Sequence, residues 1–258
     1  MFRWLSPHLS GVVLDDLTRD FVDKVLHIKE EESSPSRANR YAALIRAVLR
    51  KAEREWTDGR HPWLDRAPAI RMRPEPKHRV RWLTHAEANR LVASLPEHLS
   101  DAAAFTLQTG LRSSNGSMLK WEQIDLKREV MWIYGDQAKA KKPIGIPLNS
   151  IALAILQRRK RSNLQQAFVF EYKGAKLSRF NNHSWSSTLK RLNIKNFRWH
   201  DLRHTWASWH AQSGTPLHIL QKLGGWETAA MVEVYAHMAP EHMALDAERI
   251  VPKDLEKS

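Results

Sequence analysis

The chain has 258 residues and a formal net charge of +13, from 41 Lys plus Arg against 28 Asp plus Glu. It contains no cysteine, which excludes a disulfide framework, a thiolate zinc site and a cysteine nucleophile. The hydrophobic share of 42% can form a sizeable core. No apolar run reaches the roughly 18 residues of a membrane span, and no signal peptide is recognisable. We therefore expect an intracellular globular protein outside the membrane, whose excess positive charge suits nucleic acid.

The strongest boundary signal is the stretch 73–82, which holds two prolines and many charges and lacks hydrophobic periodicity. It predicts a linker between a first part, 1–72, and a second part, 83–258. In the first part, Ser34-Pro35 predicts the start of a helix. Apolar residues then recur at three- and four-residue steps, namely Tyr41, Leu44, Ile45, Val48, Leu49, Ala52 and Trp56. One strong helix is little for a unit of this size, so we expect a helical domain that is truncated at its N-terminus.

The second part is predicted to be mainly α with a small antiparallel β-sheet. Thr84 and Glu87 have the spacing of a capping box, and Gly110 fits a helix C-cap. Two strands are expected at 130–134 and 144–148, joined by the basic connection 135–143. The other expected elements are a short strand at 167–172, helices after Asn149 and at 184–192, 201–213, 216–223 and 228–237, helix ends at Gly214 and Gly224, and an amphipathic tail at 241–250.

Nucleotide hydrolysis and metal chemistry have little support in the sequence. The chain has neither a GxxxxGK[ST] nor a GxGxxG motif, and no carboxylate cluster that suits a two-metal nuclease. His200 and His204, four residues apart, could bind zinc on a helix, but the sequence offers no obvious third ligand. We therefore expect neither a metal nor another cofactor.

Phosphodiester chemistry without a metal needs cationic donors around the phosphate, a nucleophile and an acid for the leaving oxygen. Residues of these types occur at Arg112, Lys139, His200, Arg203 and Tyr235. Taken one at a time, each also fits an ordinary structural role, such as a packed histidine, a solvated lysine or a packed tyrosine. Their order along the chain is more informative than any single residue.

In that order and spacing the sequence resembles the tyrosine recombinase (phage integrase) family, most closely its prophage-integrase branch. The resemblance extends over residues 37–240. Its motifs are Thr109-Gly-Leu-Arg112, Lys139 in the basic connection, His200-Asp-Leu-Arg203, and Leu223-Gly-Gly-Trp226 followed by Tyr235. It implies a catalytic domain, 83–258, with a C-terminal docking tail, preceded by a short helical domain that clamps duplex DNA.

The resemblance also implies a site-specific DNA recombinase that cuts and rejoins DNA without metal or ATP. Tyr235 would attack a backbone phosphate and form a 3′-phosphotyrosyl bond. Arg112, Arg203 and Trp226 would stabilise the transition state. His200 would act as a base or proton shuttle.

Lys139 would protonate the leaving 5′-oxygen. The implied partners are double-stranded DNA attachment sites, further copies of the chain in a homotetramer on DNA, and accessory DNA-bending or excision proteins. The implied role is prophage integration or excision, that is, viral genome integration, in the cytoplasm of a bacterial host.

Basic residues of both parts are expected to contact the DNA backbone. They are Arg40, Arg46, Arg50, Lys51, Arg79 and Arg81. For the residues on the predicted helix, the alternative is a solvated face without a ligand.

Two departures from the family pattern leave other functions open. Asn115 stands where many members have a carboxylate, and an amide can orient a neighbour without supplying charge. The first part is short, and an arm-type DNA-binding domain is not recognisable. One alternative is therefore a truncated prophage remnant that only binds DNA or regulates, since residues 214–235 superficially resemble a helix-turn-helix. Another is a relaxing topoisomerase that uses the same tyrosine chemistry.

Overall fold

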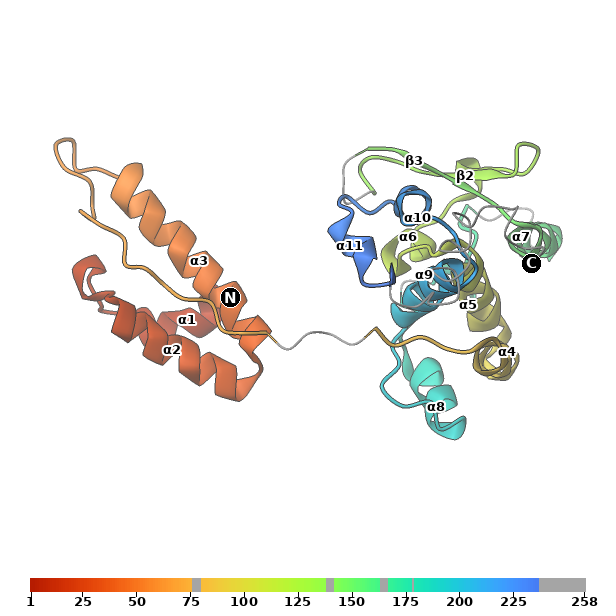
Figure 1. Cartoon of the computed structure of the whole chain (residues 1–258), viewed down its shortest axis with the longest axis horizontal. Helices are drawn as coiled ribbons and strands as arrows, with labels where there is room; N and C mark the ends of the chain where they lie inside the picture. Colours follow the sequence, from red (N-terminus) through yellow and green to blue (C-terminus); the bar gives the residue numbers. More distant parts are fainter. Residues whose placement is uncertain (76–79, 138–141, 163–166, 178, 237–258) are drawn as a thin grey trace, which may run out of the picture. The chain divides into compact units, whose positions relative to one another are not determined.

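The computed structural model describes residues 1–75, 80–137, 142–162, 167–177 and 179–236. The chain divides into two compact units, Met1–His78 and Arg79–Ser258, and each is described by itself (Figure 1). No helix within the described ranges is both long and apolar enough to cross a membrane.

The first unit is a small helical domain. Thr18 and Ser34 cap its two long helices, since their hydroxyls accept hydrogen bonds from the backbone N–H groups of Phe21 and Arg37 at 3.3 and 3.2 Å. These two helices lie side by side in Figure 1 and bury their apolar faces against each other. The elements are α1 (Phe2–Leu9), a 3-10 turn (Leu14–Asp16), α2 (Arg19–Glu32) and α3 (Pro35–Arg54).

The expectation of a single strong helix in this unit is wrong, because α1 and α2 form as well. The buried face of α2 is a short apolar stripe in a helix that is otherwise rich in charge, and it includes Lys29. The stem of Lys29 is buried, while its ammonium lies 2.6 Å from a carboxylate oxygen of Glu32 and 4.2 Å from the ring centre of Trp4. Because one of the buried positions of α2 is a lysine, the hydrophobic periodicity that would predict this helix is weak.

Arg73, the first residue of the predicted linker 73–82, is bound to the first unit. The side chain of Asn39 bonds the backbone N–H and C=O of Arg73 at 2.7 and 2.9 Å, and the Arg73 guanidinium pairs with Asp23 at 2.6 Å. On the other side, the N–H of Leu83 donates to the hydroxyl of Thr205 at 3.2 Å, so it belongs to the second unit. The charges that made this stretch resemble a solvated linker are partly satisfied by ion pairs within each unit.

The second unit is mainly α with small antiparallel sheets, as predicted. One sheet has the order β1-β2-β3, with Met131 opposite Ile146, and β4 and β5 form a separate two-stranded sheet. The helices are α4 (His85–Ser94), α5 (Glu97–Thr109), α6 (Ser113–Ser117), α7 (Ser150–Ser162), α8 (His183–Arg191), α9 (Asp201–Gln212), α10 (Leu217–Gly224) and α11 (Ala230–Glu233), with a 3-10 turn at Trp121–Gln123. The strands are β1 (Ile124–Asp125), β2 (Val130–Ile133), β3 (Ile144–Pro147), β4 (Glu171–Tyr172) and β5 (Ala175–Lys176).

Most predicted helices of this unit form with the expected caps, and two elements are shorter than predicted. The capping box of Thr84 and Glu87 is present. Helix α10 ends at Gly224, as predicted, and its C-cap is Gly225, which has a left-handed φ of 60°. The helix predicted at 228–237 is reduced to α11, and the strand predicted at 167–172 to β4. The predicted tail at 241–250 lies outside the described residues.

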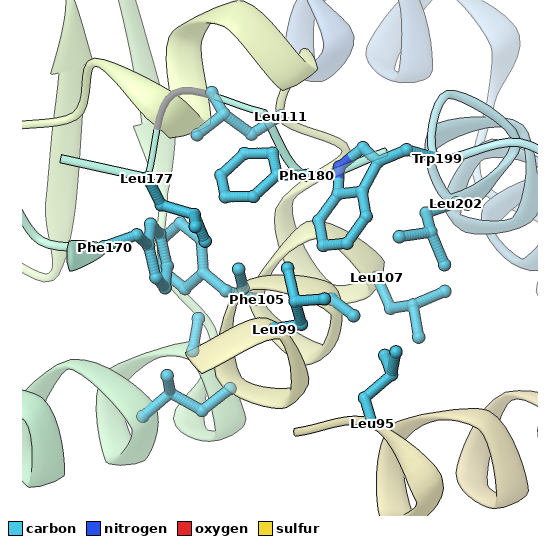
Figure 2. Packing of buried hydrophobic residues seen from close by; sticks show 14 of the residues in the cluster. Leu95, Leu99, Phe105, Leu107, Leu111, Phe170, Leu177, Phe180, Trp199 and Leu202 are labelled. Atoms are coloured by element: carbon cyan, nitrogen blue, oxygen red, sulfur yellow. The ribbon is translucent and has the colours of Figure 1, made fainter. Parts of the chain in front are cut away.

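An aromatic cluster fixes the relative position of α5 and the start of α9 (Figure 2). Phe105 of α5 packs on Phe170 with 5.5 Å between ring centres, and Phe180 stacks on Trp199 at 4.4 Å. Trp199 directly precedes the turn into α9. Helices α5 and α9 also lie side by side, so the end of α5 is held close to the first turn of α9.

We expect Gly110→Ala to destabilise the second unit strongly. Gly110 ends α5 with a φ of 62°, and an added Cβ would lie 2.2 Å from the Trp206 ring. Gly174 is the matched control, since its φ is 76° but its Cβ would meet nothing within 4 Å. Gly174→Ala should cost only about 1 kcal/mol for the backbone, while the clash at Gly110 should add roughly 1–3 kcal/mol. Denaturant unfolding of both variants measures the difference, and equal losses would refute the steric argument.

Candidate active site

The candidate site gathers where the ends of α5 and α10 meet the first turn of α9. Arg112 is the N-cap residue of α6, directly after the turn that ends α5. His200 is the N-cap residue of α9, and Arg203 and His204 follow in its first turn. Tyr235 lies in the turn after α11.

Arg203 is the buried centre of the site, with 5% of its surface exposed. Its Nη1 and Nη2 donate to the backbone carbonyls of Gly110 and Gly224 at 2.8 and 2.6 Å. These bonds tie the ends of α5 and α10 to α9. A guanidinium has five N–H donors, so two such bonds leave donors for an anion.

Arg112 places a second guanidinium next to the first, with Nη2 donating to the carbonyl of Gly225 at 3.0 Å. Burial lowers the pKa of Arg112, and burial together with the charge of Arg112 lowers the pKa of Arg203 to about 9. Both remain cationic at neutral pH, at an electrostatic cost. An anion bound between them would offset that cost, which suits this pair to a phosphate.

Tyr235 has its hydroxyl in contact with His204, with 2.6 Å between Oη and Nδ1. The tyrosine is 1% exposed, and burial raises its pKa to about 12, although the charge of Arg203 acts in the opposite direction. Burial, with the charge of His200, lowers the pKa of His204. Both groups are therefore neutral at pH 7 and share one hydrogen bond.

Trp226 forms one wall of the site. Its ring stacks under the Arg203 guanidinium, 4.1 Å from Cζ, and lies 6.0 Å from the Tyr235 ring centre. The Trp206 ring also stacks on Trp226, with 6.0 Å between ring centres. Gly224 makes room for this arrangement, because an added Cβ there would lie 1.9 Å from the Trp226 ring.

Five of the six residues predicted for catalysis come together in the second unit. They are Arg112, His200, Arg203, Trp226 and Tyr235. Lys139 lies outside the described residues. Sequence reasoning missed the contact of His204 with Tyr235, since it considered His204 only as a zinc ligand. It also missed the backbone carbonyls that hold the two arginines.

His200, the residue predicted to act as a base or proton shuttle, packs against His204. Its ring meets the ring of His204 edge-on, with 5.1 Å between centres. Burial and the charge of Arg203 lower its pKa. Among the described residues, Tyr235 has a recorded hydrogen bond to His204 and none to His200.

The predicted DNA-contacting residues are divided between the two units. Arg40, Arg50 and Lys51 are exposed on α3 and Arg46 is half-buried there; Lys51 pairs with Glu55 at 2.8 Å. In the second unit, Arg81 donates to the carbonyl of Trp82 and lies 3.6 Å from Glu87. Arg79 lies outside the described residues.

Asn115, the departure from the family pattern, is buried in α6, 3.5 Å from the hydroxyl of its neighbour Ser114. Searching the described residues for three or more His, Cys, Asp or Glu that could hold a metal ion yields no such group. The pair His200 and His204 therefore lacks a third ligand there.

The fold is that of recombinases whose structures are solved with DNA. The Tn1549 transposon integrase in complex with transposon right end DNA superimposes with a TM-score of 0.77 at 17% identity, over 96% of this chain and 91% of that one. A λ integrase dimer bound to a core site gives a TM-score of 0.70 at 19% identity, over 91% of this chain and 68% of that one. At such identities the likeness concerns the fold alone.

Sequence comparison gives the family. Residues 81–242 match the phage integrase family, and the chain belongs to it. The integrase of Salmonella phage P22 is 42% identical over 222 residues, which is 81% of this chain and 56% of that protein. The tyrosine recombinase XerC of Xanthomonas axonopodis pv. citri is 27% identical over 188 residues, 69% of this chain and 61% of that protein. The chain thus spans somewhat more than half the length of these relatives, and the resemblance inferred from its motifs is confirmed.

Proposed function

We propose that this chain is a site-specific DNA recombinase that cuts and rejoins DNA through a covalent bond to Tyr235. The observation that supports this most is the position of the tyrosine hydroxyl beside His204, within a site that also holds the cations Arg112 and Arg203. A nucleophile, a proton acceptor and an anion-binding pair are the groups that metal-free attack on a phosphodiester needs.

In the proposed reaction, Tyr235 Oη attacks the scissile phosphorus and the bond from phosphorus to the 5′-oxygen breaks. The electron pair of that bond leaves on the 5′-oxygen, and Lys139 supplies its proton. Arg112, Arg203 and the indole N–H of Trp226 bind the phosphate oxygens as charge develops. The phosphotyrosyl ester conserves the bond energy, so attack by a 5′-hydroxyl in the reverse direction rejoins DNA without ATP.

The raised pKa of Tyr235 indicates how much stabilisation the site must give to the attacking oxygen. With a pKa of about 12, the hydroxyl is ionised in about one molecule in 10⁵ at pH 7. Forming the phenolate would cost roughly 7 kcal/mol, against about 4 kcal/mol for an ordinary tyrosine. Attack therefore requires that the proton leaves as the new bond forms, and that the two guanidinium groups stabilise the phosphate in the transition state.

The proposed partners are double-stranded attachment sites and further copies of the chain in a tetramer, with accessory DNA-bending or excision proteins. The proposed role is integration or excision of a prophage inside a bacterial cell. The identity to the integrase of Salmonella phage P22 supports this choice over general DNA relaxation. The first unit, with Arg40, Arg50 and Lys51 on the exposed face of α3, would bind duplex DNA.

Covalent trapping tests the proposed chemistry directly. The chain is incubated with nicked duplexes whose sequence is randomised around the scissile phosphate, so that cleavage releases a short fragment and cannot be reversed. We expect an adduct that withstands denaturant and maps to a peptide containing Tyr235. Specific DNA binding without any adduct would instead support a regulatory protein, and relaxation of plasmids without site preference a topoisomerase.

A further inference from the structure

The basic atom in contact with the nucleophile belongs to a residue outside the predicted catalytic set. His204 Nδ1 lies 2.6 Å from Tyr235 Oη, whereas His200 faces the ring of His204. The phenol has a single hydrogen to donate. A neutral imidazole with its hydrogen on Nε2 presents a lone pair at Nδ1, which matches that donor.

We propose that His204, rather than His200, accepts the proton of Tyr235 during the attack on DNA. The inference rests on the proposed function. As Oη forms its bond to phosphorus, the O–H bond breaks and the proton moves to Nδ1, so that His204 becomes an imidazolium. The bond from phosphorus to the 5′-oxygen breaks at the same time, and that oxygen receives its proton from a separate acid. In religation the proton returns from Nδ1 to Oη.

Both partners of this hydrogen bond are held by their surroundings. Thr205, which follows His204 on α9, is fully buried, and its hydroxyl donates to the carbonyl of Asp201 at 2.8 Å. The backbone N–H of Tyr235 donates to the carbonyl of Val232 in α11 at 3.0 Å. An acceptor fixed at hydrogen-bond distance is the geometry that proton transfer requires.

Burial and the charges around His204 keep its imidazole neutral, which is the form that can accept a proton. Burial lowers its pKa most, His200 and Arg203 on the same helix lower it further, and Asp201 raises it. Tyr235 faces it from the segment after α11, and Arg112, before α6, is the next cation beyond Arg203. A proton on His204 is costly in this setting, but a bound phosphate would bring negative charge beside the imidazolium as it forms.

The test measures the rate of adduct formation by His204→Asn. The substrate carries a sulfur in place of the scissile 5′-oxygen, because a thiolate leaves without a proton and the rate then reports activation of the nucleophile alone. Asparagine keeps a hydrogen-bond acceptor but cannot take up a proton. We expect the variant to form the adduct about 10²-fold more slowly, on the scale of a lost general base.

The dependence on pH separates proton transfer from mere positioning. For the wild type we expect the rate to fall as the pH drops through the lowered pKa of His204, since an imidazolium cannot accept a proton. His204→Asn should lack this acid limb. His210→Asn is the matched control, because His210 on the same helix is half-buried and its Nδ1 also contacts a hydroxyl, that of Thr215 at 2.9 Å. It should retain both the rate and the limb.

A second variant distinguishes the loss of the base from misfolding. His204→Ala leaves space for an added base, and imidazole should restore part of its rate in proportion to the imidazole concentration. A wild-type rate and acid limb in His204→Asn, or loss of the limb in His200→Asn alone, would overturn the inference and leave the proposed function intact. If the wild type forms no adduct at Tyr235, the proposed function and this inference both fail.

Discussion

Tyr235→Phe should abolish the covalent protein–DNA adduct while DNA binding stays close to that of the wild type. The substitution removes the attacking oxygen and keeps the ring against Trp226 and His204. Because Oη forms the new bond in the proposed reaction, no remaining group can substitute for it, and the expected loss is complete within the sensitivity of the assay. Trapping on a nicked duplex measures the adduct, and a gel-shift titration measures binding.

The folded state of this variant should change little. The lost hydrogen bond to His204 contributes about 1 kcal/mol, and the removed hydroxyl no longer needs a partner in the interior. Tyr134→Phe and Tyr172→Phe are matched controls, since both tyrosines are exposed, at 43% and 46%. Each should form the adduct at the wild-type rate. An adduct that persists in Tyr235→Phe, or that disappears in one of the controls, would assign the nucleophile to another residue.

Much of the candidate site could be predicted because its chemistry constrains which side chains can serve. Arginine at two positions, histidine and tyrosine are required types, and the turn glycines mark where the chain must bend. The order and spacing of these residues were therefore enough to predict that they lie close together in the fold. Their roles in catalysis remain predictions.

The features that sequence reasoning missed depend on packing rather than on residue type. The motif His200-Asp-Leu-Arg203 singled out His200, whereas only the fold shows that His204 contacts Tyr235. The carbonyls of Gly110 and Gly224, which orient Arg203, have no signature in the sequence because every residue has a carbonyl. Helix α2 was missed for a similar reason: in a sequence, a lysine is interpreted as a surface residue, whereas Lys29 lies on the buried face of this helix.

Arg203→Ala and Arg112→Ala should each slow cleavage by about 10²- to 10³-fold, the scale for losing one preorganised donor to a developing charge. DNA binding should fall much less, since many other basic residues are proposed to contact the phosphate backbone. The two variants should differ in stability. Arg203→Ala leaves the carbonyls of Gly110 and Gly224 without their donor, at about 1–3 kcal/mol each. Part of that loss is offset because the repulsion with Arg112 disappears.

Arg112→Ala should retain nearly the full stability, because Arg112 makes a single recorded bond within the described residues, to the carbonyl of Gly225. Arg191→Ala is the matched control, since this exposed arginine also donates to a backbone carbonyl, that of Ser94 at 2.7 Å, away from the site. Single-turnover cleavage at saturating protein separates chemistry from binding, and denaturant unfolding gives the stability. Arg203→Lys should stay impaired, because one ammonium cannot hold both carbonyls and the phosphate in the planar arrangement of a guanidinium. If cleavage and binding fall equally in Arg112→Ala and Arg203→Ala, the two arginines are ordinary phosphate contacts and do not act on the transition state.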